Sequence, residues 1–324
     1  MKNSSIIYGI SANLDLVSTV ANHLGIEIGK NEVKHFADGE IIVENYTTVR
    51  GKDIYIIQST CPPVTERLFE LLLFIDGLRR ASARKITVIM PYYGYARQDR
   101  KANPREPISA RLVADMLQMA GADHVVVTDL HTPQIQGFFT VPIDDLSATP
   151  LFGEYFSHNL KGKDIVVVSP DHGGIARARR LSTHLGPNTT LAIIDKRRPR
   201  PNQVEVMNVI GSVKGKTAIL VDDILDTGNT LAEAAKALIN AGAMEVYAAV
   251  SHPLLNDGAC QRIEDSPLKE VIVTDSIPLE EKKKTPKIKV ISIAPMIAEA
   301  IDIMENNGSM SKVYDIFKTK GEIA

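Results

Sequence analysis

The chain has 324 residues, 44% of them apolar, and a mean hydropathy of −0.03, which predicts a globular protein with room for two domains of ordinary size. Lys and Arg number 37 and Asp and Glu 39, so the net charge of −2 gives no general field for binding nucleic acid or a membrane surface. The only cysteines, Cys61 and Cys260, are far apart, and the first residues lack the apolar stretch of a signal peptide, which together indicate a cytoplasmic protein.

Short apolar runs alternate with segments of helical periodicity through most of the chain. The expected strands, in chain order, are Ile54–Gln58, Ile86–Pro91, His124–Asp129, Ile165–Ser169, Thr190–Ile194, Thr217–Val221, Glu245–Val250, Glu270–Thr274 and Lys289–Ser292. Apolar residues at three- and four-residue spacing predict helices at Thr65–Arg80, Ile108–Ala120, Ile175–His184 and Thr230–Ala241. This alternation predicts an α/β fold with mainly parallel sheets flanked by helices.

A weak internal repeat divides the chain. The segments that begin "DIYIIQST" and "TAILVDDILDTGNTL" both have the order strand, polar loop, long helix, turn and strand. The repeat predicts two similar domains, residues 1–147 and 148–290, followed by a helical tail at 291–324 that could pack back on the N-terminal domain. The most apolar stretch, "LFELLLFIDGL", contains Glu70 and Asp76, which favours a buried helix over a membrane span.

The stretch "TAILVDDILDTGNTL" has the features of a binding site for a phosphorylated sugar. Asp222 and Asp223 are expected beyond the carboxyl end of a parallel strand, where such sheets bind ligands. The turn 226–230 then directs backbone N–H groups and the positive end of a helix at one point, which suits a phosphate. Carboxylates can accept hydrogen bonds from sugar hydroxyls. The alternative is an ordinary strand-to-helix turn in which Asp226 or Thr230 caps the helix.

The motifs together resemble a known family. "ILVDDILDTGNT" is similar to the phosphoribosyl diphosphate-binding signature of type I phosphoribosyltransferases and ribose-phosphate diphosphokinases. The segments "HFADGE", "PYYGYARQDRK", "DLHTPQIQGFF", "VSPDHGG" and "DKRRPRPN" extend the resemblance to class I ribose-phosphate diphosphokinases over nearly the whole chain. It implies two phosphoribosyltransferase-like domains, the first on the ATP side and the second on the ribose 5-phosphate side. It also implies diphosphoryl transfer from ATP to the 1-hydroxyl of ribose 5-phosphate, which gives phosphoribosyl diphosphate and AMP for nucleotide biosynthesis.

The resemblance also implies a role for individual residues. The expected ATP-binding residues are Phe36, which stacks on adenine, and Asp38, Gly39, Glu40, Arg97 and Gln98. The expected ribose 5-phosphate-binding residues are Arg198, Asp222, Asp223, Asp226, Thr227, Gly228, Asn229 and Thr230. Lys196 and Arg198 are the expected catalytic residues, and His131 and Asp171 the expected ligands of Mg²⁺. The family usually has glycine at the position of Asn229, and Asn tolerates the left-handed backbone angles that such a turn can need.

Read locally, several of these motifs have simpler alternatives. "FADGE" suits an ordinary hairpin turn. The tyrosines and arginines of "YYGYARQDRKANPREP" suit either RNA contact or a solvated loop, and the basic segment "DKRRPRPN" suits a solvated connection. A single His131 after a strand is most often a satisfied loop residue.

The family resemblance further implies a homohexamer, with the 38–40 turn reaching a neighbouring subunit's site, and activation by inorganic phosphate. Arg50, Ser82 and Arg100 are plausible anion contacts at a regulatory site. Three other functions remain open at this point: a phosphoribosyltransferase, which needs only one such domain; an RNA-binding regulator, which needs an extended basic face; and a non-catalytic regulatory homologue. The expected partners are therefore ATP and ribose 5-phosphate, with no nucleic acid and no membrane.

Overall fold

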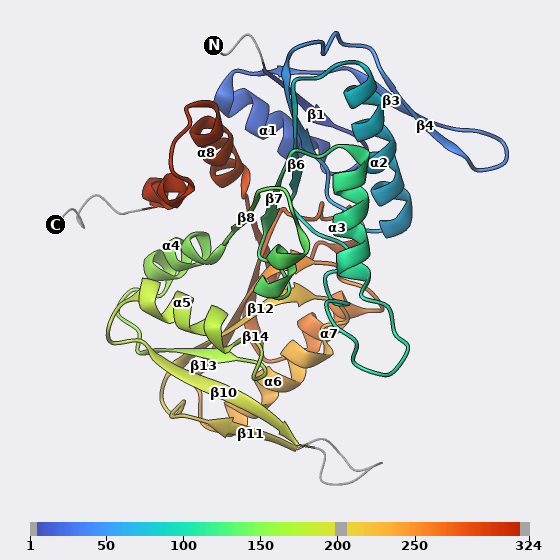
Figure 1. Cartoon of the computed structure of the whole chain (residues 1–324). Coiled ribbons are helices and arrows are strands. Elements are labelled where there is room, and N and C mark those ends of the chain that lie inside the picture. The colour runs from blue at the N-terminus through green and yellow to red at the C-terminus, as the bar shows by residue number, and fades with distance from the viewer. Residues whose placement is uncertain (1–4, 198–205, 318–324) are drawn as a thin grey trace. The chain divides into compact units, whose positions relative to one another are not determined.

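The computed structural model describes residues 5–197 and 206–317, and the chain divides into two compact units (Figure 1). Unit 1 comprises Met1–Ser147, Ser276–Pro278 and Ser292–Asp315, and unit 2 comprises Ala148–Asp275, Leu279–Ile291 and Ile316–Ala324. Each unit has its own hydrophobic core, built on its own sheet.

Unit 1 contains a six-stranded sheet in which every neighbouring pair is parallel. In spatial order its strands are β2 (Glu27–Ile28), β1 (Ser5–Gly9), β5 (Asp53–Ile57), β6 (Lys85–Met90), β7 (His124–Thr128) and β8 (Ile143–Leu146). Its helices are α1 (Leu14–Leu24), α2 (Val64–Arg80), α3 (Ser109–Ala120), η2 (Pro133–Phe138) and α8 (Ala294–Glu305), which η4 (Met310–Phe317) follows.

Helices enclose the sheet of unit 1 because each carries one apolar stripe. In α2 the buried residues include Leu68, Leu71, Leu72 and Ile75, at the three- and four-residue spacing of one helix face. With α3 they pack against alternate residues of β1, β5, β6 and β7. Helix α8 packs against α1, and Glu305 at its end accepts hydrogen bonds from the hydroxyls of Ser5 and Tyr55.

A separate antiparallel hairpin extends away from the sheet of unit 1 (Figure 1). Its strands are β3 (Asn31–His35) and β4 (Ile41–Asn45), joined by the turn that contains "FADGE". Phe36 at the turn is 55% exposed, so the hairpin presents an aromatic ring to solvent.

Unit 2 contains a seven-stranded sheet, parallel except for the edge pair β10–β11. In spatial order its strands are β11 (Val206–Ile210), β10 (Thr190–Arg197), β9 (Ile165–Ser169), β12 (Thr217–Leu225), β13 (Glu245–Pro253), β14 (Leu268–Thr274) and β15 (Ile288–Ile291). Side chains alternate between its faces. One face packs against α4 (Thr149–Asn159) and α5 (Ile175–Leu185), and the other against α6 (Asn229–Asn240) and α7 (Ala259–Asp265). A short 3-10 helix, η3 (Glu281–Lys283), precedes β15.

The predicted α/β class, with two similar, mainly parallel sheets flanked by helices, is confirmed. All nine predicted strands and all four predicted helices are present, with shifts of a few residues at their ends. The short strands β1 to β4, β8 and β11, and the helices α1, α4 and α7, were not predicted. Strand β12 continues to Leu225 where an end at Val221 was predicted, because β13 provides hydrogen-bonding partners as far as Pro253.

Candidate functional site

Asp222 and Asp223 lie inside the last part of β12, and not beyond its end as predicted. Strand β9 pairs with β12 only as far as Leu220, so the two acids project past the end of β9 while β13 still supports them on the other side. The Asp223 side chain is 7% exposed and the Asp222 side chain 18% exposed. Asp222 Oδ1 accepts a hydrogen bond of 2.9 Å from the Asp223 backbone N–H.

The two buried carboxylates influence one another electrostatically. Burial is the largest cause that raises the pKa of Asp222 to about 8, and the neighbouring Asp223 raises it further, whereas Arg177 lowers it. A carboxyl whose pKa is higher in the folded protein stabilises the fold fully below its unfolded pKa of 3.8, and this contribution is lost as the pH rises through about 8.

This pKa leads to a prediction about stability. Asp222→Asn should raise the free energy of unfolding relative to the unsubstituted protein, and the gain should grow from pH 5 to pH 9 by about 1 kcal/mol or more, because a pKa shift of one unit corresponds to about 1.4 kcal/mol. Urea unfolding at both pH values measures it, with exposed Asp164→Asn as the control. A gain that is the same at both pH values would contradict the prediction.

The turn after β12 has the geometry expected of an anion site. Gly228 is the N-cap residue of α6, with φ of 79°, and as a glycine it has no side chain with which to cap the helix. The first N–H groups of a helix have no partner within it, so here they point out of the helix end together with its positive dipole. The residue at the N-cap position is therefore Gly228, and neither Asp226 nor Thr230.

Asn229 does not need the left-handed conformation that the sequence analysis considered for it. The left-handed residue is Gly228, and Asn229 is the first residue of α6. The difference from the family's usual glycine therefore carries no backbone strain at this position.

The loop after β13 and the helix α7 that follows it contact the turn 226–230. The Asn256 side chain donates a hydrogen bond of 2.9 Å to the Asp226 carboxylate, and the Asn256 backbone N–H donates one of 2.9 Å to the Asp226 carbonyl. Arg262 Nη1 donates at 2.8 Å to the Thr227 carbonyl. A Cβ on Gly228 would lie 3.4 Å from the Ala259 carbonyl oxygen. The Asp226 side chain is thus engaged by this loop, which was not anticipated from the sequence.

The loop after β9 lies next to the acid pair within unit 2. Asp171 is exposed, and its Oδ1 accepts a hydrogen bond of 2.9 Å from the Gly174 N–H at the start of α5. A Cβ on Gly174 would lie 2.7 Å from Ser169 Oγ and 3.8 Å from the Val221 carbonyl. Only glycine therefore allows the start of α5 to approach the ends of β9 and β12 this closely.

Lys196, one of the two expected catalytic residues, belongs to the last part of β10. The backbone of Lys196 pairs with Met207 of β11, but the Lys196 side chain and all of Arg198 lie outside the part of the chain that the structure describes. Asp195, just before Lys196, is 3.9 Å from His172 Nε2, so the loop after β9 and the end of β10 are neighbours in unit 2.

The residues 36–40 form the turn of the β3–β4 hairpin, as their turn-like pattern predicted. The Phe36 N–H donates to the Glu40 carbonyl at 2.8 Å and the Gly39 N–H donates to the Phe36 carbonyl at 2.9 Å. Gly39 has φ of 92°, a conformation that favours glycine, and the Glu40 N–H donates to Asp38 Oδ1 at 3.1 Å.

Arg97, Gln98 and His131 lie on two loops of unit 1 that contact each other. Arg97 and Gln98 are exposed, and the Gln98 side-chain carbonyl accepts a hydrogen bond from Ser109 at the start of α3. His131 follows the end of β7 by three residues. The next residue, Thr132, donates a hydrogen bond of 2.8 Å to Asp99, which joins the two loops.

The two expected metal ligands belong to different units, His131 to unit 1 and Asp171 to unit 2. Among the residues described, no group of three or more His, Cys, Asp or Glu side chains is gathered to hold a metal ion. The exposed carboxylate of Asp171 is a suitable donor for Mg²⁺, which prefers oxygen ligands and keeps several waters, whereas an imidazole is a less usual ligand for this ion.

Three residues near the acids and the turn were missed by the sequence analysis: Arg177, Asn256 and Arg262. Each contacts the site from another element, at a sequence separation of 30 to 46 residues. The only local signal was the polar run "NDG" at 256–258, which predicts a turn but not its partner.

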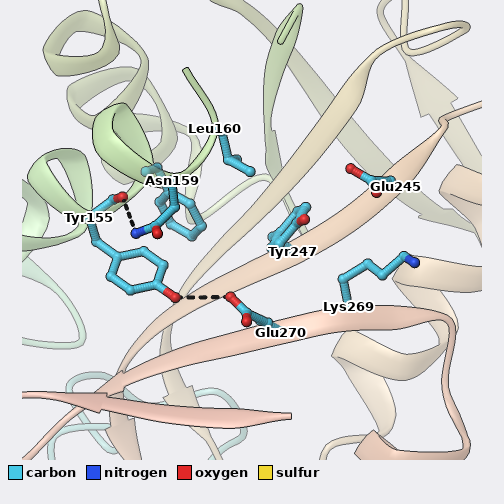
Figure 2. A pocket seen from close by; sticks show the side chains of 8 residues that line it. Tyr155, Asn159, Leu160, Glu245, Tyr247, Lys269 and Glu270 are labelled. Atoms are coloured by element: carbon cyan, nitrogen blue, oxygen red, sulfur yellow. Dashed lines mark hydrogen bonds between the residues drawn. The ribbon is translucent and has the colours of Figure 1, made fainter. Parts of the chain in front are cut away.

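A cavity of about 330 Å³ lies elsewhere in unit 2 (Figure 2). It is at the end of α4 and the beginnings of β13 and β14, whereas the acids lie at the carboxyl end of β12. Tyr155 donates a hydrogen bond of 2.9 Å to Glu270 across one side of the cavity, and Lys163 pairs with Glu245. The cavity is therefore not part of the candidate site.

Within the described parts of the chain, every helix is too short or too polar to span a bilayer.

Comparison with known proteins identifies the family. The model of the N-terminal domain of ribose phosphate pyrophosphokinase matches residues 5–121, and the phosphoribosyl synthetase-associated domain matches residues 178–315. The chain is 51% identical over 316 residues to a ribose-phosphate pyrophosphokinase of Oceanobacillus iheyensis, covering 97% of this chain and 98% of that protein. It is 53% identical over 312 residues to one of Caldanaerobacter subterraneus subsp. tengcongensis, covering 96% and 98%.

A solved structure supports the same assignment. The phosphoribosylpyrophosphate synthetase of Mycobacterium smegmatis matches with a TM-score of 0.90 and 43% identity, covering 94% of this chain and all of that one. The sequence motifs, the fold and these relatives agree over nearly the full length. This chain therefore belongs to the ribose-phosphate pyrophosphokinase family.

Proposed function

We propose that this chain transfers the diphosphoryl group of ATP to the 1-hydroxyl of ribose 5-phosphate and releases phosphoribosyl diphosphate and AMP, for nucleotide biosynthesis. The observation that carries the proposal is a sequence identity above 50%, over nearly the whole length of the chain, to proteins named ribose-phosphate pyrophosphokinase. The acid pair in β12 and the turn after it, with Gly228 at the N-cap of α6, support a sugar phosphate site there.

The assay for this function follows AMP by nucleotide chromatography. Incubation with ATP, ribose 5-phosphate and Mg²⁺ should give AMP and phosphoribosyl diphosphate in equal amounts, and omission of the sugar should abolish both. AMP formed equally well without the sugar, or no AMP at all, would refute the proposal. A phosphoribosyltransferase would instead consume added phosphoribosyl diphosphate in the presence of a base.

In the proposed complex, unit 2 holds the sugar. The turn 226–230 receives the 5-phosphate on its outward N–H groups, with the Thr227 and Thr230 hydroxyls as further donors. Asp222 and Asp223 accept hydrogen bonds from the ring hydroxyls, and Arg198 contacts the same substrate. These contacts hold the sugar so that its 1-hydroxyl points in one direction. Such alignment lowers the activation free energy by several kcal/mol, because the entropy cost of bringing the reactants together is met on binding.

Unit 1 holds the nucleotide in the proposed complex. Phe36 stacks on adenine, Asp38, Gly39 and Glu40 contact it, and Arg97 and Gln98 bind ATP. The exposed ring of Phe36 on an extended hairpin supports a contact with the site of a neighbouring subunit. We therefore propose a homo-oligomer, a hexamer as in the family, in the cytoplasm. The adjacent Arg50 and Ser82, whose side chains are 3.0 Å apart, are proposed contacts for phosphate as an activator.

The chemical step needs positioning and charge neutralisation more than covalent help. The 1-hydroxyl attacks the β-phosphorus in line, and AMP leaves. Lys196 and Arg198 stabilise the negative charge that grows on the transferring group. Asp171 and His131 are the proposed residues for Mg²⁺, which when bound neutralises part of the polyphosphate charge.

Gly228 tests the role of the turn. Gly228→Val should raise the KM for ribose 5-phosphate at least tenfold, because a β-branched residue is strained at φ of 79° and its methyl groups would press on Ala259, which displaces the N–H groups. The KM for ATP should change little. Steady-state kinetics with each substrate varied in turn measures both values.

Gly215 provides a matched control for this substitution. It has φ of 76°, and among the described residues other than its two chain neighbours no atom lies within 4 Å of where its Cβ would stand. Backbone strain should lower the free energy of unfolding of Gly215→Val by about 1–2 kcal/mol, as it should in Gly228→Val. The KM of Gly215→Val for ribose 5-phosphate should stay unchanged. Equal KM values in the two variants would show that the turn 226–230 does not hold the phosphate.

A further inference from the structure

Arg177 is a buried cation that faces both acids of the proposed sugar site. It lies in the first turn of α5, and its side chain is 11% exposed. Its Nη1 donates a hydrogen bond of 3.2 Å to Asp223 Oδ1 and lies 3.8 Å from Asp222 Oδ1. One terminal nitrogen therefore lies close to both carboxylates.

The position of Arg177 is fixed by the start of α5. The helix begins directly after the loop 170–174, where Asp171 holds the Gly174 N–H and Gly174 packs closely against Ser169 and Val221. Arg177 thus connects the loop after β9 to the acids of β12 within unit 2. Arg177 and Asp223 are 46 residues apart in the sequence, so no local motif contains both and their contact could not be predicted from one.

We propose that Arg177 is a positioning residue for ribose 5-phosphate, whose Nη1 holds the carboxylates of Asp222 and Asp223 in the arrangement that accepts the ring hydroxyls. The inference rests on the proposed function and adds a residue to its sugar site. Arg177 does not touch the sugar in this account and acts only through the two acids.

The electrostatic interaction between Asp222 and Asp223 supports the positioning role of Arg177. Two adjacent carboxylates out of water repel each other, and without a cation each would turn away or bind a proton. Burial raises the pKa of Asp222 most and Asp223 raises it further, while Arg177 is the larger of the two influences that lower it, ahead of the hydrogen bond from the Asp223 backbone N–H. A protonated carboxyl loses acceptor capacity for a hydroxyl, so removal of Arg177 should weaken sugar binding most at low pH.

The test compares Arg177→Gln with Arg177→Lys. The Gln variant should bind ribose 5-phosphate at least tenfold more weakly by isothermal titration calorimetry and raise its KM equally, with the KM for ATP within about twofold. The pH at which sugar binding becomes half-maximal should move upward. Lys should restore both values to within about threefold, because one nitrogen close to both acids is what the geometry uses. Arg180→Gln, an exposed arginine on the same helix, should behave as the unsubstituted protein.

A double-mutant cycle makes the test independent of simple loss of stability. In an Asp223→Asn background, Arg177→Gln should weaken sugar binding by less than about threefold further, because the residue through which Arg177 acts is already altered. Fully additive losses, or unchanged sugar affinity in Arg177→Gln, would overturn the inference. An unsubstituted protein that binds ribose 5-phosphate but forms no AMP would instead overturn the proposed reaction, so the two failures are distinguishable.

Discussion

Asp222→Asn is expected to raise the KM for ribose 5-phosphate about ten- to a hundredfold and to leave the KM for ATP within about twofold. At pH 9, above the Asp222 pKa of about 8, the amide keeps the shape of the side chain but removes the charge. Hydrogen bonds to charged groups contribute about 1.5–3 kcal/mol, which corresponds to that range of affinity. The pairing of Asp223 with Arg177 at 3.2 Å is retained, so the substitution removes one acceptor and leaves the rest of the cluster in place. Steady-state kinetics and calorimetry with ribose 5-phosphate measure the effect.

The same substitution has opposite expected effects on binding and on stability. Asp222→Asn should stabilise the fold at pH 9, because it removes a buried carboxyl that is costly to ionise. A loss of sugar affinity in a more stable protein cannot come from partial unfolding. Exposed Asp164→Asn serves as the control for both measurements, and unchanged KM for the sugar in Asp222→Asn would remove Asp222 from the proposed site.

The elements that form the proposed sugar site could be predicted in outline because they are contiguous in sequence. A strand, two acids, a turn and a helix follow each other within Thr217–Leu231, and local periodicity is enough to order them. The fold class followed from the same alternation repeated along the chain. The hairpin turn at 36–40 could also be placed, because Gly39 between two acids is a local turn signal.

What could not be predicted depends on contacts between distant segments. The length of β12 depends on β13, which pairs with it through Leu225 and so draws the acids into the sheet. Arg177, Asn256 and Arg262 hold the acids and the turn from three other segments. No spacing rule connects residues that meet only after the sheet has formed.

Several unpredicted elements have a different cause. Strands β3 and β4 pair with each other and are half-exposed or exposed. The only apolar residue of β3 is Val33, and β4 begins with a run of three, Ile41–Val43, which is shorter than the apolar run by which a buried strand is recognised. Strand β11 has four apolar residues among its five, so it carried a local signal that the sequence prediction did not use; it pairs with β10 in the antiparallel direction.

Lys196→Ala is expected to lower kcat about a hundred- to a thousandfold, the usual effect of removing one group that stabilises charge in a transition state. The KM values should change by no more than about threefold, because an interaction made mainly in the transition state contributes little to ground-state binding. The fold should persist, since residue 196 takes part in β10 through its backbone, which alanine keeps. The rate of AMP formation at saturating ATP and ribose 5-phosphate measures the effect.

Two further measurements connect the loss to the ammonium group. A small primary amine added to Lys196→Ala should restore part of the rate, because it can occupy the space left by the side chain and carry the same charge. Lys236→Ala, which removes an exposed lysine paired with Glu233 on α6, should keep full activity. A fall in kcat of less than about tenfold in Lys196→Ala would show that charge on the transferring phosphoryl group is stabilised elsewhere, and the assigned role of Lys196 would be wrong.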